Sequence, residues 1–128
     1  MRLLLDTHLV LWAALRVKML PAGVADILND PANQLLFSVV SVWEVAIRFA
    51  LRRADFTTDP VVLRQELLNN GYTELPITGP HAIAVAGLPP VHRDPFDRLL
   101  LAQALVEGLV PLTADPLLGR YPGPVRVV

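Results

Sequence analysis

The most constraining feature of the sequence is a short apolar run near its start that ends abruptly on a carboxylate. Leu3, Leu4 and Leu5 precede Asp6, and a continuous apolar stretch of this kind is typical of a strand buried in the centre of a parallel sheet. Ligands bind at the carboxyl edge of such a sheet, where strand order reverses and leaves a crevice. Asp6 is therefore a candidate for chemistry, although the same residue could simply cap a helix that begins near Thr7.

Strand-like and helix-like segments alternate along the rest of the chain. Further strands are predicted at 35–40, 74–77, 110–113 and 125–128. Helices are predicted at 7–15, 21–29, 41–52, 60–69 and 78–88. A further predicted helix has Asp97 in its first turn and ends at Glu107, and a last, short one follows Pro116. This alternation predicts an α/β fold, a three-layer α/β/α sandwich with a mainly parallel central sheet and right-handed crossovers. The 128 residues fit one domain, 1–128.

Two helix starts can be predicted from their residue spacing. Ser41 and Glu44 have the S-x-x-E spacing of a capping box, which predicts a helix that opens at Ser41 with Glu44 in its first turn. Asp94 stands before Pro95, as an N-cap stands before proline at the first helical position. We therefore interpret Asp94 mainly as a cap.

Composition narrows the classes of function. The chain has no cysteine, which excludes disulfides and thiolate metal sites, and no run approaches the roughly 18 apolar residues of a membrane span. A cytoplasmic protein without a membrane segment is expected. Eleven basic and 12 acidic side chains give a net charge of -1, which argues against avid, nonspecific binding of nucleic acid. The 53% of hydrophobic residues is high for this length, so part of the surface is expected to meet another subunit or partner.

Four acids are predicted to meet at the carboxyl edge of the sheet. Asp6 ends the first strand, and Asp115 follows the fourth. Glu44 and Asp97 lie in the first turns of predicted helices, whose N-termini gather at the same edge because helices run antiparallel to the strands. Each acid also has a structural interpretation: Glu44 as part of its capping box, Asp97 as the acidic partner of the cap at Asp94, and Asp115 as a cap.

Clustered carboxylates call for a cation. Four of them in an apolar protein repel one another, which raises their pKa values or unfolds the site unless a cation neutralises them. Without cysteine or an H-E-x-x-H pattern, the oxygen ligands favour Mg²⁺ or Mn²⁺ over zinc. Such ions activate water and stabilise a leaving oxygen, so the chemistry that they favour is hydrolysis of a phosphodiester.

Several other polar residues stand near the acids in the sequence. Arg48 and Arg52 share a helical face, and Arg93 and Arg98 flank Asp97. These arginines could hold a phosphate backbone, or they could form salt bridges to the same acids or to a partner.

The hydroxyl and imidazole side chains near the acids have open roles. Thr113 could orient a metal-bound water or fill a strand end, and Thr7, next to Asp6, is a further candidate near the substrate. His8 and His92 could touch substrate, but packing or surface roles are favoured for both.

Four sequence blocks together resemble the PIN-domain family, specifically the VapC-like toxins of bacterial type II toxin-antitoxin systems. The blocks are Leu3–His8, Ser41–Arg48, His92–Leu100 and Leu112–Asp115. The resemblance implies the PIN α/β/α sandwich and a Mg²⁺- or Mn²⁺-dependent endoribonuclease acting on RNA. It also implies that Asp6, Glu44 and Asp97 are the three principal metal-site acids, and that Asp115 with Thr113 occupies the more variable fourth position.

The resemblance further implies partners. The family usually forms homodimers, and its toxins are inhibited by a small cognate antitoxin, which would suit the apolar surface around Trp12, Trp43 and Phe49. An alternative is a catalytically inactive PIN-like module that binds RNA or protein. A phosphoacceptor receiver domain is disfavoured because it needs a late lysine, whereas the sole lysine, Lys18, follows the first helix.

Overall fold

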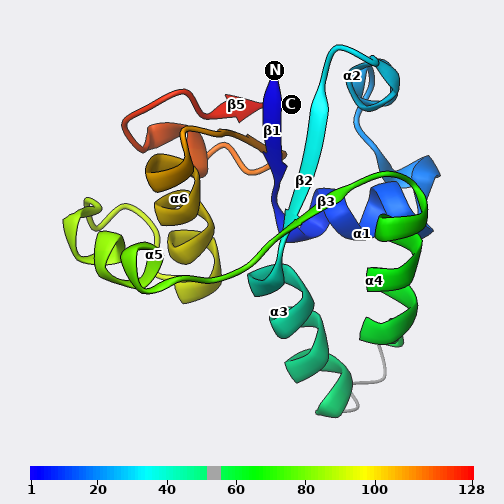
Figure 1. The fold of residues 1–128 in the computed structure, drawn as a ribbon, viewed down its shortest axis with the longest axis horizontal. Coiled ribbons are helices and arrows are strands. Elements are labelled where there is room, and N and C mark those ends of the chain that lie inside the picture. Colours follow the sequence, from blue (N-terminus) through cyan, green and yellow to red (C-terminus); the bar gives the residue numbers. More distant parts are fainter. Residues whose placement is uncertain (52–55) are drawn as a thin grey trace.

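The computed structural model describes residues 1–51 and 56–128, which contain a five-stranded sheet (Figure 1). The strands are β1 (Arg2–Leu5), β2 (Gln34–Ser38), β3 (Thr73–Leu75), β4 (Val110–Thr113) and β5 (Arg126–Val127). Their order is β3-β2-β1-β4-β5, and every neighbouring pair is parallel. The predicted α/β class with a parallel sheet is confirmed.

Helices cover both faces of this sheet. They are α1 (Thr7–Leu15), α2 (Val24–Asn29), α3 (Val39–Ala50), α4 (Pro60–Asn69), α5 (Gly79–Ala84) and α6 (Pro95–Glu107). Short 3₁₀ turns occupy Val17–Met19, Val85–Gly87 and Leu118–Arg120. Figure 1 shows α5 and α6 on one side of β1 and β2, and α1, α2 and α4 on the other, which gives the predicted three layers. Within the described residues, no helix has the length and apolar character needed to cross a membrane.

The leucines of β1 supply both halves of the core. Leu3 and Leu5 belong to the buried cluster that includes residues of α1 and α4, whereas Leu4 packs with Leu100 and Ala104 of α6. Successive side chains of a strand point to opposite faces, so a strand covered on both faces must be apolar throughout. This requirement explains the uninterrupted leucine run.

The strand order creates a crevice beside β1. From β1 the chain crosses to β2 on one side, while β4 lies on the other side, so the crossovers diverge between β1 and β4. Asp6 follows β1 directly, Thr113 is the last residue of β4, and Asp115 lies two residues beyond it. The sheet thus brings residues more than 100 positions apart to one edge.

The junction between β2 and α3 differs from the sequence prediction. The apolar, β-branched pair Val39–Val40 was predicted to extend the strand, yet the helix already begins at Val39. The reason is Ser38, whose buried Oγ accepts a hydrogen bond from the Val40 N–H at 3.0 Å and also pairs with Gln103. Ser41 is therefore not the cap, and Glu44 lies in the second turn of α3. The predicted helix end at Arg52 lies outside the described residues.

Most other predicted boundaries are confirmed to within a few residues. Asp59, Thr78 and Asp94 cap α4, α5 and α6 through their side chains, and Gly108, with a φ of 68°, ends α6 in the left-handed conformation that glycine adopts without strain. The predicted helix at 21–29 is shorter, because α2 begins only at Val24.

Candidate active site

Asp6 is the buried centre of a hydrogen-bond network at the carboxyl edge. Its Oδ1 accepts from the Leu9 N–H at 2.9 Å, which caps α1, and its Oδ2 accepts from the Thr113 hydroxyl. Thr113 Oγ1 in turn accepts from the Asp115 N–H at 2.9 Å. Burial raises the pKa of Asp6, and the hydrogen bonds from Thr113 and Leu9 oppose that rise. Asp6 therefore both caps α1 and lies at the carboxyl edge of the sheet.

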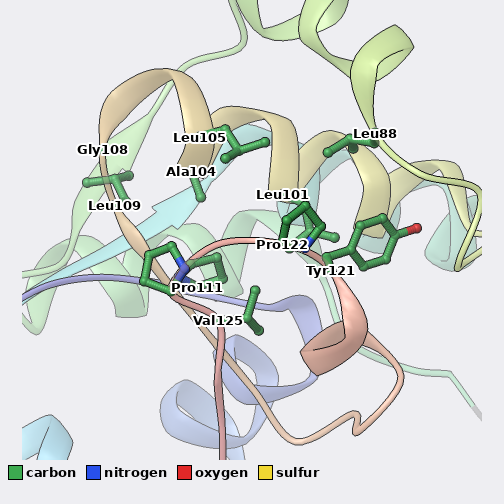
Figure 2. Close-up of a pocket in the computed structure, with 11 residues that line it drawn as sticks. Leu88, Leu101, Ala104, Leu105, Gly108, Leu109, Pro111, Tyr121, Pro122 and Val125 are labelled. Carbon is green, nitrogen blue, oxygen red and sulfur yellow. The ribbon is translucent and has the colours of Figure 1, made fainter.

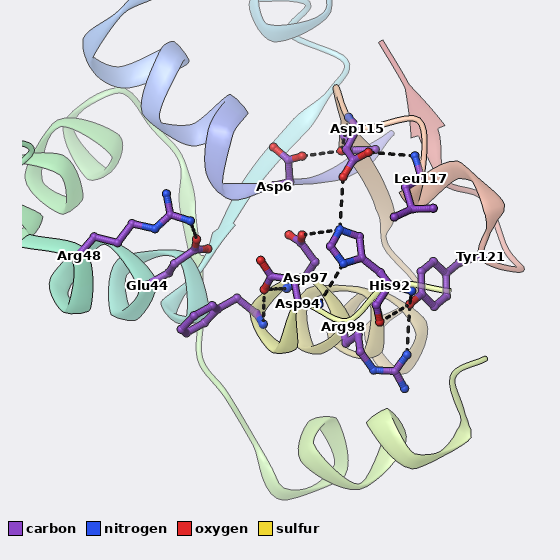
Figure 3. Close-up of polar contacts among 12 residues, drawn as sticks. Asp6, Glu44, Arg48, His92, Asp94, Asp97, Arg98, Asp115, Leu117 and Tyr121 are labelled. Carbon is purple, nitrogen blue, oxygen red and sulfur yellow. Dashed lines mark hydrogen bonds and ion pairs between the residues drawn. The ribbon is translucent and has the colours of Figure 1, made fainter. Parts of the chain in front are cut away.

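His92 bridges Asp97 and Asp115 (Figure 3). Its Nε2 lies 3.3 Å from Asp97 Oδ2 and 3.4 Å from Asp115 Oδ2. The backbone N–H of Asp94 donates to His92 Nδ1 at 3.0 Å, and because a backbone N–H can only donate, Nδ1 must be the acceptor. Nε2 therefore carries the hydrogen that faces the two carboxylates. The His92 ring holds together acids from α6 and from the loop after β4.

Glu44 approaches the same region from α3. Its side chain is 5% exposed, and Oε2 lies 2.6 Å from Arg48 Nη2 one helical turn later. Of the two interpretations of Arg48, the salt bridge to a neighbouring acid is the one observed. The Arg48 guanidinium also lies over the Phe56 ring, 5.8 Å from its centroid.

Negative charge accumulates around Asp97. Burial raises the pKa of its carboxyl to about 7, and the charges of Asp94, Asp6 and Glu44 act in the same direction, while His92 opposes them. The negative charges of Asp94, Asp6 and Glu44 therefore all raise the pKa of Asp97. The geometry places Asp6, Glu44, Asp97 and Asp115 around one region.

Comparison with known proteins agrees with this architecture. The model of the PIN-domain family matches residues 3–124. The chain belongs to the PIN-domain family. No curated protein matches the sequence.

Three solved structures share the fold of this PIN domain. The first is VapBC2 from Rickettsia felis bound to a DNA fragment from its promoter, with a TM-score of 0.72 and 14% identity over 98% of this chain and 96% of that chain. The second is DNA-bound VapBC from Salmonella typhimurium, with a TM-score of 0.69 and 16% identity over 100% and 97%. The third is VapBC-1 from nontypeable Haemophilus influenzae, with a TM-score of 0.61 and 19% identity over 91% and 88%.

The donor set of this PIN domain fits a hard divalent cation. One ligand atom each of His92, Asp97 and Asp115 lies within 4.8 Å of the others, and the charges of Asp94, Asp6 and Glu44 add to burial in raising the pKa of Asp97. Carboxylate oxygens suit Mg²⁺ or Mn²⁺. Because His92 carries its hydrogen on Nε2, it acts as a hydrogen-bond donor to the two acids and not as a metal ligand.

Among the described residues, the Arg98 guanidinium bonds with backbone carbonyls and Tyr121 rather than with the acids, and its contact with substrate stays a prediction. Its Nη1 donates to Pro89 O at 2.8 Å and to Tyr121 Oη at 3.2 Å, and its Nη2 donates to the carbonyls of Val85 and Leu88 at 3.3 Å each. Figure 3 shows its side chain turned away from Asp97 toward Tyr121. The guanidinium fastens the loop before α6, because four acceptors surround it there.

Thr7 and Arg93 were also predicted near the substrate, and the structure places one of them in the interior and the other at the surface. Thr7 is buried, and its hydroxyl pairs with Ser41 Oγ at 3.0 Å, so it joins α1 to α3 instead of facing a substrate. Arg93 is exposed beside His92 and stays a candidate for contact with phosphate.

The contacts of Arg98 predict a stability effect. Arg98→Ala is expected to lower the free energy of unfolding by about 2–3 kcal/mol, because several partly buried acceptors lose a charged donor. Urea denaturation of the purified variant measures this. Arg93→Ala, an exposed neighbour, is the matched control and is expected to change stability by less than about 0.5 kcal/mol. Equal effects of the two substitutions would contradict the assignment.

Sequence reasoning missed the part played by His92, for which packing or surface roles were favoured. It also missed the buried Gln103, whose side chain joins Ser38 to the Pro76 carbonyl. His81, next to it, is fully buried and forms a capping box with Thr78. The spacing of Thr78 and His81 was an available signal for that cap. The contacts of Gln103 left no such signal, since Ser38 and Pro76 are distant in sequence. Asp97 stands close to His92 in the sequence, and that proximity was an available signal, whereas Asp115, the other partner of His92, is distant.

A separate apolar pocket lies at the other end of α6 (Figure 2). Leu101, Leu105, Pro111, Tyr121 and Val125 are among the residues that line it. No acid is among the described residues that line it, so this pocket is distinct from the site at Asp6.

Proposed function

We propose that this PIN domain is a Mg²⁺- or Mn²⁺-dependent endoribonuclease and the toxin of a toxin-antitoxin pair. The observation that carries the proposal is the gathering of Asp6, Glu44 and Asp97 from three separate elements around one region. Membership in the PIN-domain family and the shared fold of the VapBC structures support it.

Hydrogen bonds and ion pairs hold the acids of the proposed site in place. Asp6 and Asp97, with Glu44 and Asp115, would hold the cation, and Thr113 fixes the orientation of Asp6. His92 keeps Asp97 and Asp115 together through its Nε2–H. When bound, a divalent cation supplies an activated water and neutralises charge on the phosphate. The protein's own contribution is to hold four carboxylates at fixed positions despite their repulsion.

The proposed protein partners are a second copy of the chain and an antitoxin. The side chains of Trp43, Ile47, Phe49 and Leu51 are 50%, 37%, 41% and 62% exposed along α3 and the residue after it. Apolar exposure of this extent on one helix is typical of a surface that another protein covers. The VapBC structures with the same fold are complexes, which supports an antitoxin as one partner.

Cleavage of RNA by the purified protein tests the proposal. Single-stranded RNA is expected to be cut at discrete positions with Mg²⁺ or Mn²⁺ and to stay intact in excess EDTA. Asp6→Asn is expected to reduce the rate at least about 100-fold, because it removes a charge that holds the cation. Mapping the cut ends in total cellular RNA, wild type against Asp6→Asn, separates true sites from contaminating nuclease.

The alternative of an inactive binding module makes a different prediction. Retained RNA binding without cleavage at any metal concentration would favour it. Full activity in EDTA would refute both metal dependence and the role assigned to the acids.

A further inference from the structure

A groove leads away from the acids across one face of α1. It consists of two adjoining hollows that share His8 and Trp12. The first hollow also contains Asp6 and Asp115, and the second continues to Arg16, Arg48 and Phe56. We call the part formed by His8, Trp12, Arg16, Arg48 and Phe56 the aromatic groove. It adjoins the acid site at His8 and Trp12, which line both hollows.

The aromatic groove offers ring surfaces that a ligand can reach. The rings of His8 and Trp12 lie 5.8 Å apart and are tilted by 44°, so neither covers the other face to face. His8 is exposed, and Trp12 and Phe56 are partly exposed. Aromatic side chains in this state are the platforms on which unpaired bases stack.

The charges of the groove are ordered along its length. Asp6 and Asp115 line one end, and Arg16 lines the hollow at the other. Arg48 connects the two ends, because it pairs with Glu44 at 2.6 Å and lies over Phe56. A strand whose phosphates alternate with flat bases matches this order: a cation at the acids takes one phosphate, a ring takes a base, and an arginine takes the next phosphate.

We propose that the aromatic groove binds the nucleotide next to the scissile phosphate of single-stranded RNA, with its base on Trp12 and its far phosphate at Arg16. This inference rests on the proposed function, since it names a substrate contact of the same site. It assigns recognition to unpaired bases rather than to a double helix, in which the base faces are already stacked.

The direct test combines a substitution with a set of modified substrates. In a single-stranded oligoribonucleotide that contains a mapped cut, each position near the cut is made abasic in turn. With the wild type, one position is expected to lower kcat/KM about 5- to 100-fold, which is the effect of one stacked base. With Trp12→Leu, the intact substrate is expected to lose a similar factor, and removal of that base is expected to have little further effect.

Three variants serve as controls. Trp12→Phe keeps a ring and is expected to restore the dependence on that base. Trp43→Leu changes the other tryptophan, which packs edge-on against Phe96 at 5.1 Å outside the groove lining, and is expected to leave the pattern of sensitive positions unchanged. Arg16→Ala is expected to weaken all substrates alike and to reduce the salt dependence by about one charge.

A second measurement does not require cleavage. Trp43→Phe leaves Trp12 as the sole tryptophan, because the chain contains two. Adding the oligoribonucleotide in EDTA is expected to quench the Trp12 fluorescence, and the oligoribonucleotide that lacks the critical base is expected to quench it less. This signal reports stacking whether or not the protein is active.

The outcomes separate the two proposals. The wild type could cleave RNA although no abasic position depends on Trp12 and no quenching is seen. That result would overturn the groove assignment and leave the nuclease function intact. The groove would then be assigned to a protein partner. Quenching without cleavage of any RNA would refute the nuclease function and the placement beside a scissile phosphate, and would leave only the stacking of a base on Trp12. Neither quenching nor cleavage would refute both.

Discussion

Asp97→Asn is expected to abolish RNA cleavage and at the same time to stabilise the protein in EDTA at pH 8. The loss of activity, at least about 100-fold, follows from removing a carboxylate assigned to the cation. The gain in stability follows from the raised pKa of Asp97, which is about 7 in the fold against an ordinary value of 3.8. One substitution thus acts on the two properties in opposite directions.

The sign of the stability effect follows from proton linkage. Between about pH 4 and pH 7 the folded protein binds the Asp97 proton more tightly than the unfolded chain does, so stability falls as pH rises through this range. Above pH 7 the folded protein carries the full cost of the charged, largely buried group. Asparagine carries no charge, so the variant is expected to be more stable than the wild type by about 2–4 kcal/mol at pH 8 and equally stable near pH 3.

Urea denaturation in EDTA at a series of pH values measures this effect. Asp26→Asn is the matched control, because Asp26 is an exposed acid in α2, remote in sequence from the cluster. It is expected to leave the pH dependence unchanged. A wild type whose stability rises steadily from pH 4 to pH 8, or an Asp97→Asn variant that is less stable than the wild type at pH 8, would contradict the charge surplus inferred around Asp97.

Divalent cations are expected to offset the loss of folding stability that the acid cluster causes. At pH 8, Mn²⁺ at about 100 times its dissociation constant would stabilise the wild type by about 2.7 kcal/mol, or roughly 10 °C in Tm for a domain of this size. The physical reason is that the cation binds the folded cluster and not the dispersed carboxylates of the unfolded chain. Thermal melts followed by circular dichroism, with and without MnCl₂, measure the shift.

The metal effect has an internal control. Asp97→Asn is expected to show a much smaller shift, because one of the carboxylates is gone, and sodium chloride at matched ionic strength controls for screening. An equal shift in both proteins would place the cation elsewhere.

The sequence predicted the elements that depend on local patterns. The leucine run of β1, covered on both faces, has one reasonable interpretation, and a strand followed by an acid places that acid at the carboxyl edge. Asp94 and Pro95 predicted the start of α6 because capping is a local interaction. The positions of Asp6, Asp97 and Asp115 followed from these elements once the strands were taken as parallel.

What the sequence could not predict depends on contacts between distant segments. Val39 and Val40 suit a strand by their branching, but Ser38 caps α3 by accepting from the Val40 N–H, and its side chain is held by the bond with Gln103, 65 residues later. Arg98 stands beside Asp97 in the sequence, yet its side chain points the other way because backbone carbonyls before α6 surround it. Neighbouring positions on a helix face different directions, so proximity in sequence was a poor guide there.

The hydrogen bond between Thr113 and Asp6 joins residues 107 positions apart, and this separation has a consequence for protein synthesis. A growing polypeptide contains Asp6 and Glu44 before β4 and the loop that carries Asp115 have been made. Until those segments follow, the central strand lacks one neighbour and Asp6 lacks the support of Thr113. Under the proposed function, a chain synthesised only as far as α6 would be inactive, and cutting would begin only after β4 and Asp115 have joined the fold.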